Sequence, residues 1–275
     1  MNTHSIDLES GSTQYLSRAD EALLSITGNM TIECWVQFES LPVNGVTGFF
    51  MVSKSGASPQ RGYGFYVQQS GGVLQLGLII SNDGSATVNK NVTWTFSTGV
   101  WYHLAVVYTA AEGTVDFYVN GVAQGAQQTG YPTSIYDNTT AFRIGAEEST
   151  GHFDGLIDDF RLWATTRTST QILDNMRVEI DTATNLVGSW HLNNALTDSS
   201  GNAFTLTNNG PAAFLNQVPW FEVSDTAGAP TESLVFEHNI TITDTAGVPI
   251  ESLTNKYGFG NLAKSSTVWQ NQAKS

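Results

Sequence analysis

The chain has 275 residues, of which 40% are hydrophobic and 11% aromatic, enough to form a substantial core. Only 13% of the residues are charged, and the formal net charge of −14 arises from 25 acidic against 11 basic residues. This balance argues against nucleic-acid binding through phosphate contacts, whereas it is compatible with calcium binding, with high-salt surroundings or with simple solubility.

Short β-strands separated by polar turns recur over the first three quarters of the chain. Asn120-Gly121 gives the sharpest turn signal, because it follows an alternating segment and favours a two-residue hairpin. We expect strands at Ser5–Leu8, Thr31–Phe38, Phe49–Lys54, Tyr63–Gln68, Leu74–Ile80, Ala86–Phe96, Trp101–Tyr108, Thr114–Val119, Ala141–Ile144, Leu156–Trp163 and Leu186–Leu192. One helix is expected at Ser169–Met176, capped by Thr168 or Ser169. The pattern predicts an all-β protein, an antiparallel β-sandwich of the jelly-roll type.

The sequence pattern changes after Phe214, so we predict a domain over residues 1–214 and a C-terminal extension over residues 215–275. Within the extension, the segment 223–234 recurs as 242–253 at an offset of 19 residues. Each copy is predicted to form a hairpin: a strand, an Asp-Thr-Ala-Gly turn and a second strand marked by proline. Two such hairpins bury little surface alone, and we expect them to pack on the main domain or on another subunit.

The segment Leu156–Trp163 combines a strand pattern with an acidic residue. Read with a period of two, Asp158 shares a face with three apolar residues, Leu156, Phe160 and Leu162. A carboxylate directed into a core must be hydrogen-bonded, paired, protonated or bound to a metal. Either backbone N–H groups, a cation such as Arg143, or calcium would satisfy it.

Six segments in order resemble the laminin-G-like, concanavalin A-like jelly-roll family over about residues 4–214. They are Ser5–Leu16, Thr31–Val36, Gly99–Leu104, Asp116–Val122, Phe142–Gly145 and Phe153–Trp163. This resemblance implies a structural calcium ion with Asp158 as a side-chain ligand. Backbone oxygens near Glu9 and Gly11, together with the carboxylate of Asp7, would complete the site, since calcium takes six to eight oxygen ligands. The tail is similar to appendages of phage-encoded or secreted proteins.

Three classes of function remain open. A glycoside hydrolase needs two carboxylates flanking the scissile bond, and Glu179-Ile180-Asp181 lacks the second glutamate of such a strand motif, so we expect no enzyme. A lectin needs aromatic and polar groups in loops. For this role we select Trp94, Tyr131, Tyr136, Asn138, Glu147 and Glu148.

The third class, a structural or attachment protein, accounts for the repeated tail as well as for the jelly roll. The N-terminus Met1–Ser5 carries no visible secretory signal, and the most apolar window, Val73–Ile80, is too short to cross a bilayer. We therefore expect a component of a virion surface or another extracellular assembly, with no membrane insertion, docked on itself or another structural protein through its tail. The single cysteine, Cys34, is expected to be buried and unreactive.

Overall fold

The computed structural model describes residues 2–45, 47–148 and 150–219, and four strands beyond them at 221–224, 234–236, 240–243 and 253–255. The chain divides into two compact units, Met1–Pro219 and Trp220–Ser275. The first unit extends past Phe214 because the strand Ala213–Leu215 pairs with the N-terminal strand. No helix among the described residues is long and apolar enough to span a membrane.

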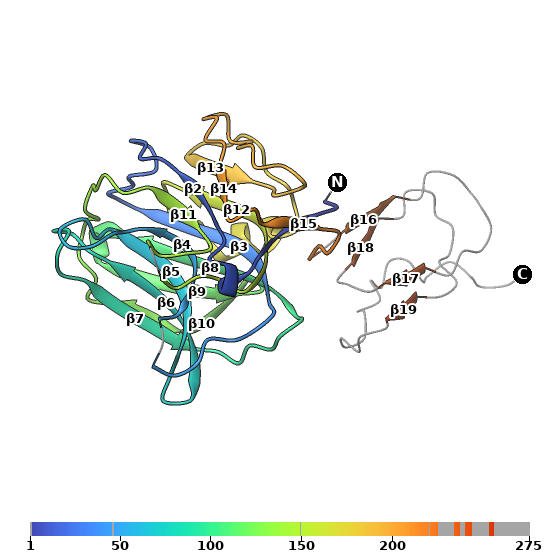
Figure 1. Cartoon of the computed structure of the whole chain (residues 1–275), viewed down its shortest axis with the longest axis horizontal. Coiled ribbons are helices and arrows are strands. Elements are labelled where there is room, and N and C mark those ends of the chain that lie inside the picture. The colour runs from blue at the N-terminus through green and yellow to red at the C-terminus, as the bar shows by residue number, and fades with distance from the viewer. Residues whose placement is uncertain are drawn as a thin grey trace, which may run out of the picture. The chain divides into compact units, whose positions relative to one another are not determined.

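Two antiparallel sheets form the first unit (Figure 1). The first sheet contains, in spatial order, β10 (Val122–Thr129), β9 (Thr114–Val119), β8 (Trp101–Thr109), β3 (Met30–Phe38), β12 (Gly155–Trp163), β1 (Ser5–Leu8) and β15 (Ala213–Leu215), and β13 (Leu186–Trp190) also pairs with β12. The second sheet contains β14 (Thr207–Asn209), β2 (Tyr15–Arg18), β11 (Phe142–Ile144), β4 (Phe49–Lys54), β5 (Tyr63–Ser70), β6 (Val73–Ile80) and β7 (Val88–Thr93). The predicted all-β, antiparallel sandwich is therefore confirmed.

Alternation along the strands places one row of apolar side chains between the two sheets. Cys34 and Val36 on β3 belong to the same buried cluster as Phe65 on β5 and Leu78 on β6. Burial of this kind stabilises by roughly 25 cal/mol per Å² of apolar surface removed from water. Burial also raises the pKa of the Cys34 thiol, which makes it a packing residue with little thiolate at neutral pH.

Short helical segments are few in the described part of the chain: η1 (Ser10–Ser12), η2 (Ala110–Glu112) and α1 (Ser169–Asn175). The predicted helix at Ser169–Met176 is confirmed as α1. Thr168 caps it, because the Thr168 hydroxyl accepts from the backbone N–H of Gln171 and the Gln171 side chain accepts from the backbone N–H of Thr168.

A β-bulge in β12 reverses the predicted direction of Asp158. Ile157 pairs with Val36 and Leu162 pairs with Ile32, so β12 has one residue more than β3 between these pairs. Asp159 adopts a positive φ of 41° at the bulge. Ile157 and Leu162 therefore both belong to the core between the sheets, and Asp158 lies on the outer face of the first sheet. The uninterrupted period-two interpretation of this strand was wrong.

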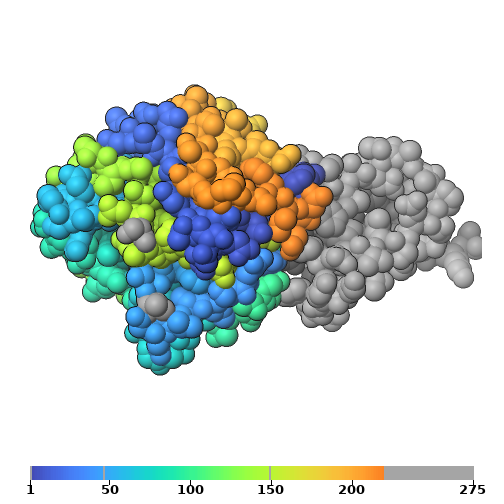
Figure 2. Space-filling model, viewed as in Figure 1, coloured from blue at the N-terminus to red at the C-terminus, as the bar shows by residue number. Residues whose placement is uncertain are grey.

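The N-terminal strand joins the two ends of the first unit. β1 pairs with β12 on one side and with β15 on the other, with Ile6 opposite Ile157 and Phe214. Figure 2 shows the N-terminal residues beside residues near 210 on the surface of this unit. Because β15 supplies the outermost strand beyond β1, the segment up to Leu215 is an integral part of the first sheet.

The second unit contains two short parallel sheets. β16 (Phe221–Ser224) pairs in parallel with β18 (Ile240–Thr243), and β17 (Leu234–Phe236) pairs in parallel with β19 (Leu253–Asn255). Strands within one copy of the repeat belong to different sheets. The predicted hairpins are therefore wrong: each strand pairs with its equivalent in the other copy.

Candidate functional site

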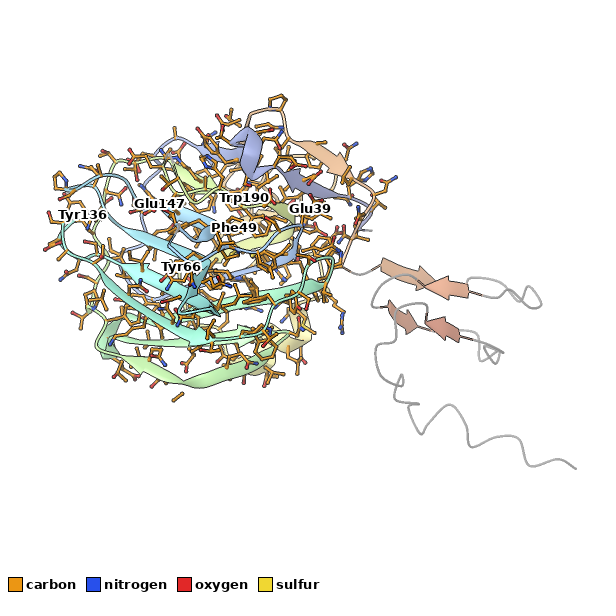
Figure 3. All side chains as sticks on the ribbon, turned by 60° about the horizontal axis from the view of Figure 1, so that its bottom comes forward. Glu39, Phe49, Tyr66, Tyr136, Glu147 and Trp190 are labelled. Atoms are coloured by element: carbon orange, nitrogen blue, oxygen red, sulfur yellow. The ribbon has the colours of Figure 1, made fainter. Side chains whose placement is uncertain are left out.

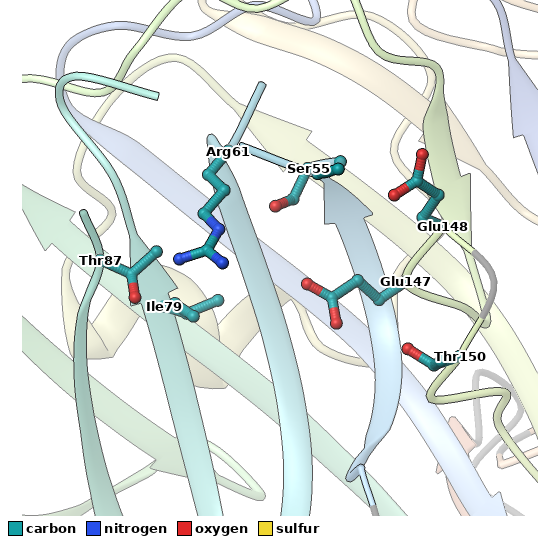
Figure 4. A pocket seen from close by; sticks show the side chains of 9 residues that line it. Ser55, Arg61, Ile79, Thr87, Glu147, Glu148 and Thr150 are labelled. Carbon is teal, nitrogen blue, oxygen red and sulfur yellow. The ribbon is translucent and has the colours of Figure 1, made fainter. Parts of the chain in front are cut away.

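A polar hollow of about 330 Å³ opens on the second sheet of the first unit. It lies where β4 ends, where β5 and β7 begin, near the end of β6 and after β11. Its lining consists of Ser55, Gly56, Ala57, Arg61, Ile79, Thr87, Glu147, Glu148 and Thr150. In Figure 4, Arg61 and Thr87 lie on one side, the two glutamates and Thr150 lie on the other, and Ser55 lies between them.

Backbone contacts hold the two charged sides of the hollow. The backbone N–H of Arg61 donates to Gly84 O, and Arg61 Nη1 donates to Ser85 O, both at 3.0 Å. Because the bond to Ser85 O is the one hydrogen bond of the guanidinium within the described ranges, most of its five N–H donors remain for a ligand. On the other side, the backbone N–H groups of Glu147 and Thr150 each donate to the other residue's carbonyl, at 3.0 and 2.7 Å. This tight turn fixes Glu147 in the hollow.

The surroundings of Glu147 in the hollow shift the pKa of its carboxyl group. Burial raises the pKa of this carboxyl, Glu148 raises it further, and the cations Arg61 and Arg143 oppose the rise. Because Arg61 faces Glu147 without a salt bridge within 4.0 Å in the described residues, both groups are free to contact one ligand from two sides. The hollow therefore offers hydrogen-bond donors on one wall and acceptors on the other.

A polar strip continues from the hollow along the outer face of β5, β6 and β7. The register gives three rows across these strands: Gly64, Ile79 and Asn89; Tyr66, Gly77 and Asn91; Gln68, Gln75 and Thr93. Two amide side chains face each other at the far end, where Gln68 Nε2 donates to Gln75 Oε1 at 3.0 Å. Amide and hydroxyl groups in rows suit a ligand with many hydroxyl groups.

Glycine at position 77 makes room for the middle row. A Cβ atom there would lie 2.2 Å from Asn91 Oδ1 and 2.6 Å from the Tyr66 hydroxyl. That hydroxyl lies within hydrogen-bond distance of the side-chain oxygens of Asn89 and Asn91 and donates to one of them, so the ring of Tyr66 is fixed; the ring packs on Phe50 with centroids 5.1 Å apart. The strip is thus a fixed surface.

The structure separates the predicted ligand residues. Glu147 and Glu148 line the hollow, whereas Tyr136 is half-buried beside Gly84 and Trp94 packs on the core edge. Tyr131 is a correction: it is buried, and its hydroxyl donates to Leu78 O at 2.7 Å.

Asn138 is a second correction among the predicted ligand residues, because it is buried. Its Nδ2 donates to Lys54 O, and its carbonyl accepts from the buried Lys54 Nζ. Tyr131 and Asn138 are therefore structural. Arg61, Ser55 and Thr87 carry no local sequence signal, because the three loops that line the hollow meet only in the fold.

Carboxylates also gather at a second place, where β1 and β3 end. Asp7, Glu9 and Glu39 each offer a carboxylate oxygen within 4.8 Å of the others. Asp7 Oδ1 is buried and has no hydrogen-bond partner among the described residues. Burial raises the pKa values of Asp7 and Glu39, and the neighbouring carboxylates, including Asp154, raise them further. Figure 3 shows that Glu39 lies well apart from Glu147, so this acidic cluster is separate from the hollow.

The predicted metal ligands are only partly brought together by this cluster. Asp7 and Glu9 belong to it, Gly11 lies just beyond in η1, and Glu39 joins them unpredicted. Asp158 is not part of the cluster; its two oxygens accept from Asn2 Nδ2 and from the backbone N–H of Asp159. The carboxylate cluster without Asp158 has the oxygen-rich chemistry that calcium prefers, and the unpartnered oxygen of Asp7 fits a cation.

Buried charges cover the outer face of the first sheet beneath α1. Glu33 Oε1 accepts from Trp163 Nε1 at 2.8 Å and lies 3.6 Å from the Nε atoms of Arg161 and Arg167. Arg161 donates to the carbonyl of Asn175, at the end of α1. These contacts attach the helix to the sheet, so we assign this layer a structural role.

Comparison with known proteins identifies the family. The Laminin_G_3 model, described as the concanavalin A-like lectin/glucanases superfamily, matches residues 10–173. The chain belongs to this superfamily. No curated protein matches this chain.

Two solved structures share the superfamily fold. A putative carbohydrate-binding protein from Bacteroides ovatus has a TM-score of 0.60 at 17% identity, with 78% of this chain covered and 60% of that one. A heptameric SAP-like pentraxin from Limulus polyphemus has a TM-score of 0.51 at 15% identity, with 78% and 94% covered. At such identities the likeness shows the fold alone, and this chain spans 60% of the length of the Bacteroides protein.

Proposed function

We propose that the first unit is a non-catalytic glycan-binding module that attaches its bearer to a carbohydrate-coated surface. The observation that carries the proposal is the hollow between Arg61 and Glu147, which continues into the polar strip over β5, β6 and β7. The fold shared with the protein described as a putative carbohydrate-binding protein also supports the proposal.

The chemistry of the hollow suits a sugar ring. Its volume of about 330 Å³ is in the range of small-ligand sites, which run from about 300 to 1,000 Å³. The Arg61 guanidinium donates to ring or hydroxyl oxygens, Glu147 accepts from hydroxyl groups, and Ile79 contributes apolar contact. The strip of amides gives further residues of an extended glycan a row of partners.

The same geometry supports binding without turnover. Glycoside hydrolysis uses two carboxylates on opposite sides of the scissile bond. The carboxylates of the hollow come from adjacent residues, Glu147 and Glu148, on one wall. The cation Arg61 occupies the opposite wall, which favours holding a polar ligand over protonating a leaving group.

A structural calcium ion forms part of the proposal. Asp7, Glu9 and Glu39 would hold it, with backbone oxygens near Gly11 as further ligands. Calcium would offset the mutual repulsion of the three carboxylates and would give Asp7 Oδ1 a partner. Its chemistry there is structural: it would join the ends of β1 and β3.

Glycan binding is tested with the full-length protein on a glycan array, followed by calorimetry with the best glycan. Arg61→Ala and Glu147→Gln should each weaken binding at least tenfold, about 1.4 kcal/mol. Glu112→Gln, which changes an exposed carboxylate of η2, is the matched control and should bind as the wild type does. Absence of glycan binding, or binding that both hollow variants leave unchanged, would contradict the proposal.

The location of the protein is still only predicted, from the sequence. A virion surface or another extracellular assembly would display the first unit and hold the second. Immunoelectron microscopy of particles from the source, with antibodies against the first unit, would test this location directly.

A further inference from the structure

In the second unit, the sequence repeat and the strand pairing have the same residue offset. Sequence identity recurs at an offset of 19 residues, as Asp225-Thr-Ala-Gly228 and Asp244-Thr-Ala-Gly247 show. Strand pairing recurs at the same offset, because Phe221 pairs with Ile240 and Leu234 pairs with Leu253. In the described strands, equivalent positions of the two copies therefore lie side by side in parallel sheets.

This pairing is the pattern of a parallel β-solenoid, in which each repeat would form one rung. One rung consists of β16 and β17, the next consists of β18 and β19, and the two strands of a rung belong to separate sheets. Stacked repeats bury a continuous core only when several rungs follow one another, and about three are needed for stability. Among the described strands this solenoid has two rungs.

The second rung presents an open edge. Within the described residues, β18 pairs with β16 alone and β19 pairs with β17 alone. The free side of such a strand is a row of backbone donors and acceptors that accepts another strand. Since purely two-stranded parallel sheets are marginal, adding a third rung would stabilise both sheets at once.

The sequence of the repeat defines which strand fits this edge. Apolar residues pair with apolar residues at equivalent positions, as in Val223 with Ile242 and Leu234 with Leu253. A rung of the same repeat from another molecule offers the same residues with the same spacing between its two strands. The intrachain pairing shows that this sequence stacks on itself in register.

We propose that two copies of this chain associate through their second units, by stacking a rung of one copy on β18 and β19 of the other. The association extends the solenoid with the register offset found inside the chain. It uses like-on-like pairing between chains, a heterologous contact that allows further copies to add. It is independent of the glycan site, which lies in the first unit.

Light scattering after size-exclusion chromatography tests the association with the full-length chain. Between about 1 and 100 µM, the mean mass should rise to at least twice the 29.7 kDa of one chain. Deletion of residues 239–257, which removes the second copy of the repeat, should abolish this rise. Near-UV circular dichroism should show that the first unit keeps its packing in the variant.

Cross-linking locates the contact. Cys34 is buried, so Thr243→Cys places the reactive thiol at the end of β18, and a short bismaleimide should join two chains through it. Thr197→Cys, at an exposed position of the first unit, is the matched control and should give at most one tenth of that yield. A monomeric full-length chain at 100 µM, oligomers that survive the deletion, or equal cross-linking of both cysteine variants would overturn the proposal.

Discussion

Asn2 Nδ2 donates to Asp158 Oδ2 at 2.7 Å, and both side chains are buried. The other oxygen of Asp158 accepts from the backbone N–H of Asp159 at 2.9 Å. Burial raises the pKa of Asp158 well above its ordinary value, and the hydrogen bond from Asn2 only partly opposes this rise. The N-terminal segment thus closes over a carboxyl group on the outer face of β12, and the carboxyl is used within the protein.

Asp158→Asn should leave the protein at least as stable as the wild type at pH 7. A carboxyl group whose pKa is raised in the folded state contributes stability at low pH and loses it as the pH rises through the folded pKa. Asparagine avoids that loss, and after a flip of Asn2 its amide can donate to Asn2 Oδ1, which has no partner in the part of the chain that the structure describes. Urea unfolding should show a gain of about 1–2 kcal/mol at pH 7 that shrinks toward pH 4. A loss of stability at pH 7 would mean that the charge itself is required, as for a metal ligand.

Glu33→Ala should lower the free energy of unfolding by about 3–5 kcal/mol, because it leaves buried cations without their carboxylate. The residue is inaccessible to solvent and contacts Trp163, Arg161 and Arg167. Glu33→Gln keeps an acceptor for Trp163 Nε1, so its loss should be smaller, and the difference separates the charge from the hydrogen bond. Urea unfolding measures both.

Glu112→Ala is the control for the Glu33 variants, since Glu112 is exposed in η2 and should change stability by no more than about 0.5 kcal/mol. If Glu33→Ala is also within that range, the buried charged layer does not attach α1 to the sheet. A near-UV change in Glu33→Ala that Glu112→Ala does not show would report loosened aromatic packing, to which Trp35 and Trp163 of this layer contribute.

Alternation along strands made most of the first unit predictable, because nearly every inner strand buries apolar residues at every second position. β10 was missed since its residues, Val122–Thr129, are mostly exposed at a sheet edge and show no apolar period. The bulge at Asp159 was also invisible, because an extra residue changes the face of everything that precedes it without changing composition. The repeat was evident from the sequence, but which strands pair was not. The same strand-turn-strand pattern fits a hairpin within one copy and a solenoid rung that pairs with the other copy.

Local sequence patterns could not identify all the residues that line the hollow. Glu147 and Glu148 were recognised as a polar pair near a loop, whereas Arg61 carries no signal in its own surroundings. Its position opposite Glu147 depends on the order β11-β4-β5 in the second sheet. Glu39 joined Asp7 for the same reason, since the ends of β1 and β3 meet only once β12 lies between them.

Calcium should raise the melting temperature of the wild-type protein, and chelator should remove the gain. At a hundredfold excess over Kd, a ligand of the native state adds about 2.7 kcal/mol of stability. Asp7→Asn and Glu39→Gln should abolish the difference because they remove carboxylates of the acidic cluster, whereas Asp158→Asn should keep it. Differential scanning calorimetry in calcium, magnesium and chelator measures the effect. Identical melting in all three for the metal-free wild type would exclude this site.

His191 should make stability depend on pH above neutrality. Its Nδ1 lies 3.1 Å from Asp159 Oδ1 and its Nε2 lies 2.9 Å from Asp181 Oδ1. Burial lowers the pKa of the imidazole, but the hydrogen bonds and charges of these carboxylates outweigh burial and raise the pKa to about 9. Because the folded pKa exceeds the unfolded value of about 6.5, the stabilisation is complete below pH 6.5 and is lost as the pH rises through 9.

His191→Asn should remove that dependence, since asparagine does not titrate. Asp181 is 76% exposed, so solvent screening limits the contribution to about 1–2 kcal/mol. The difference in unfolding free energy between the wild type and the variant, measured in urea at pH 6, 7.5 and 9.5, should fall across this series. An NMR titration of the imidazole in the folded protein gives the pKa independently. A constant difference across the three pH values, or a midpoint near 6.5 in the titration, would show that the imidazolium gains nothing from Asp159 and Asp181.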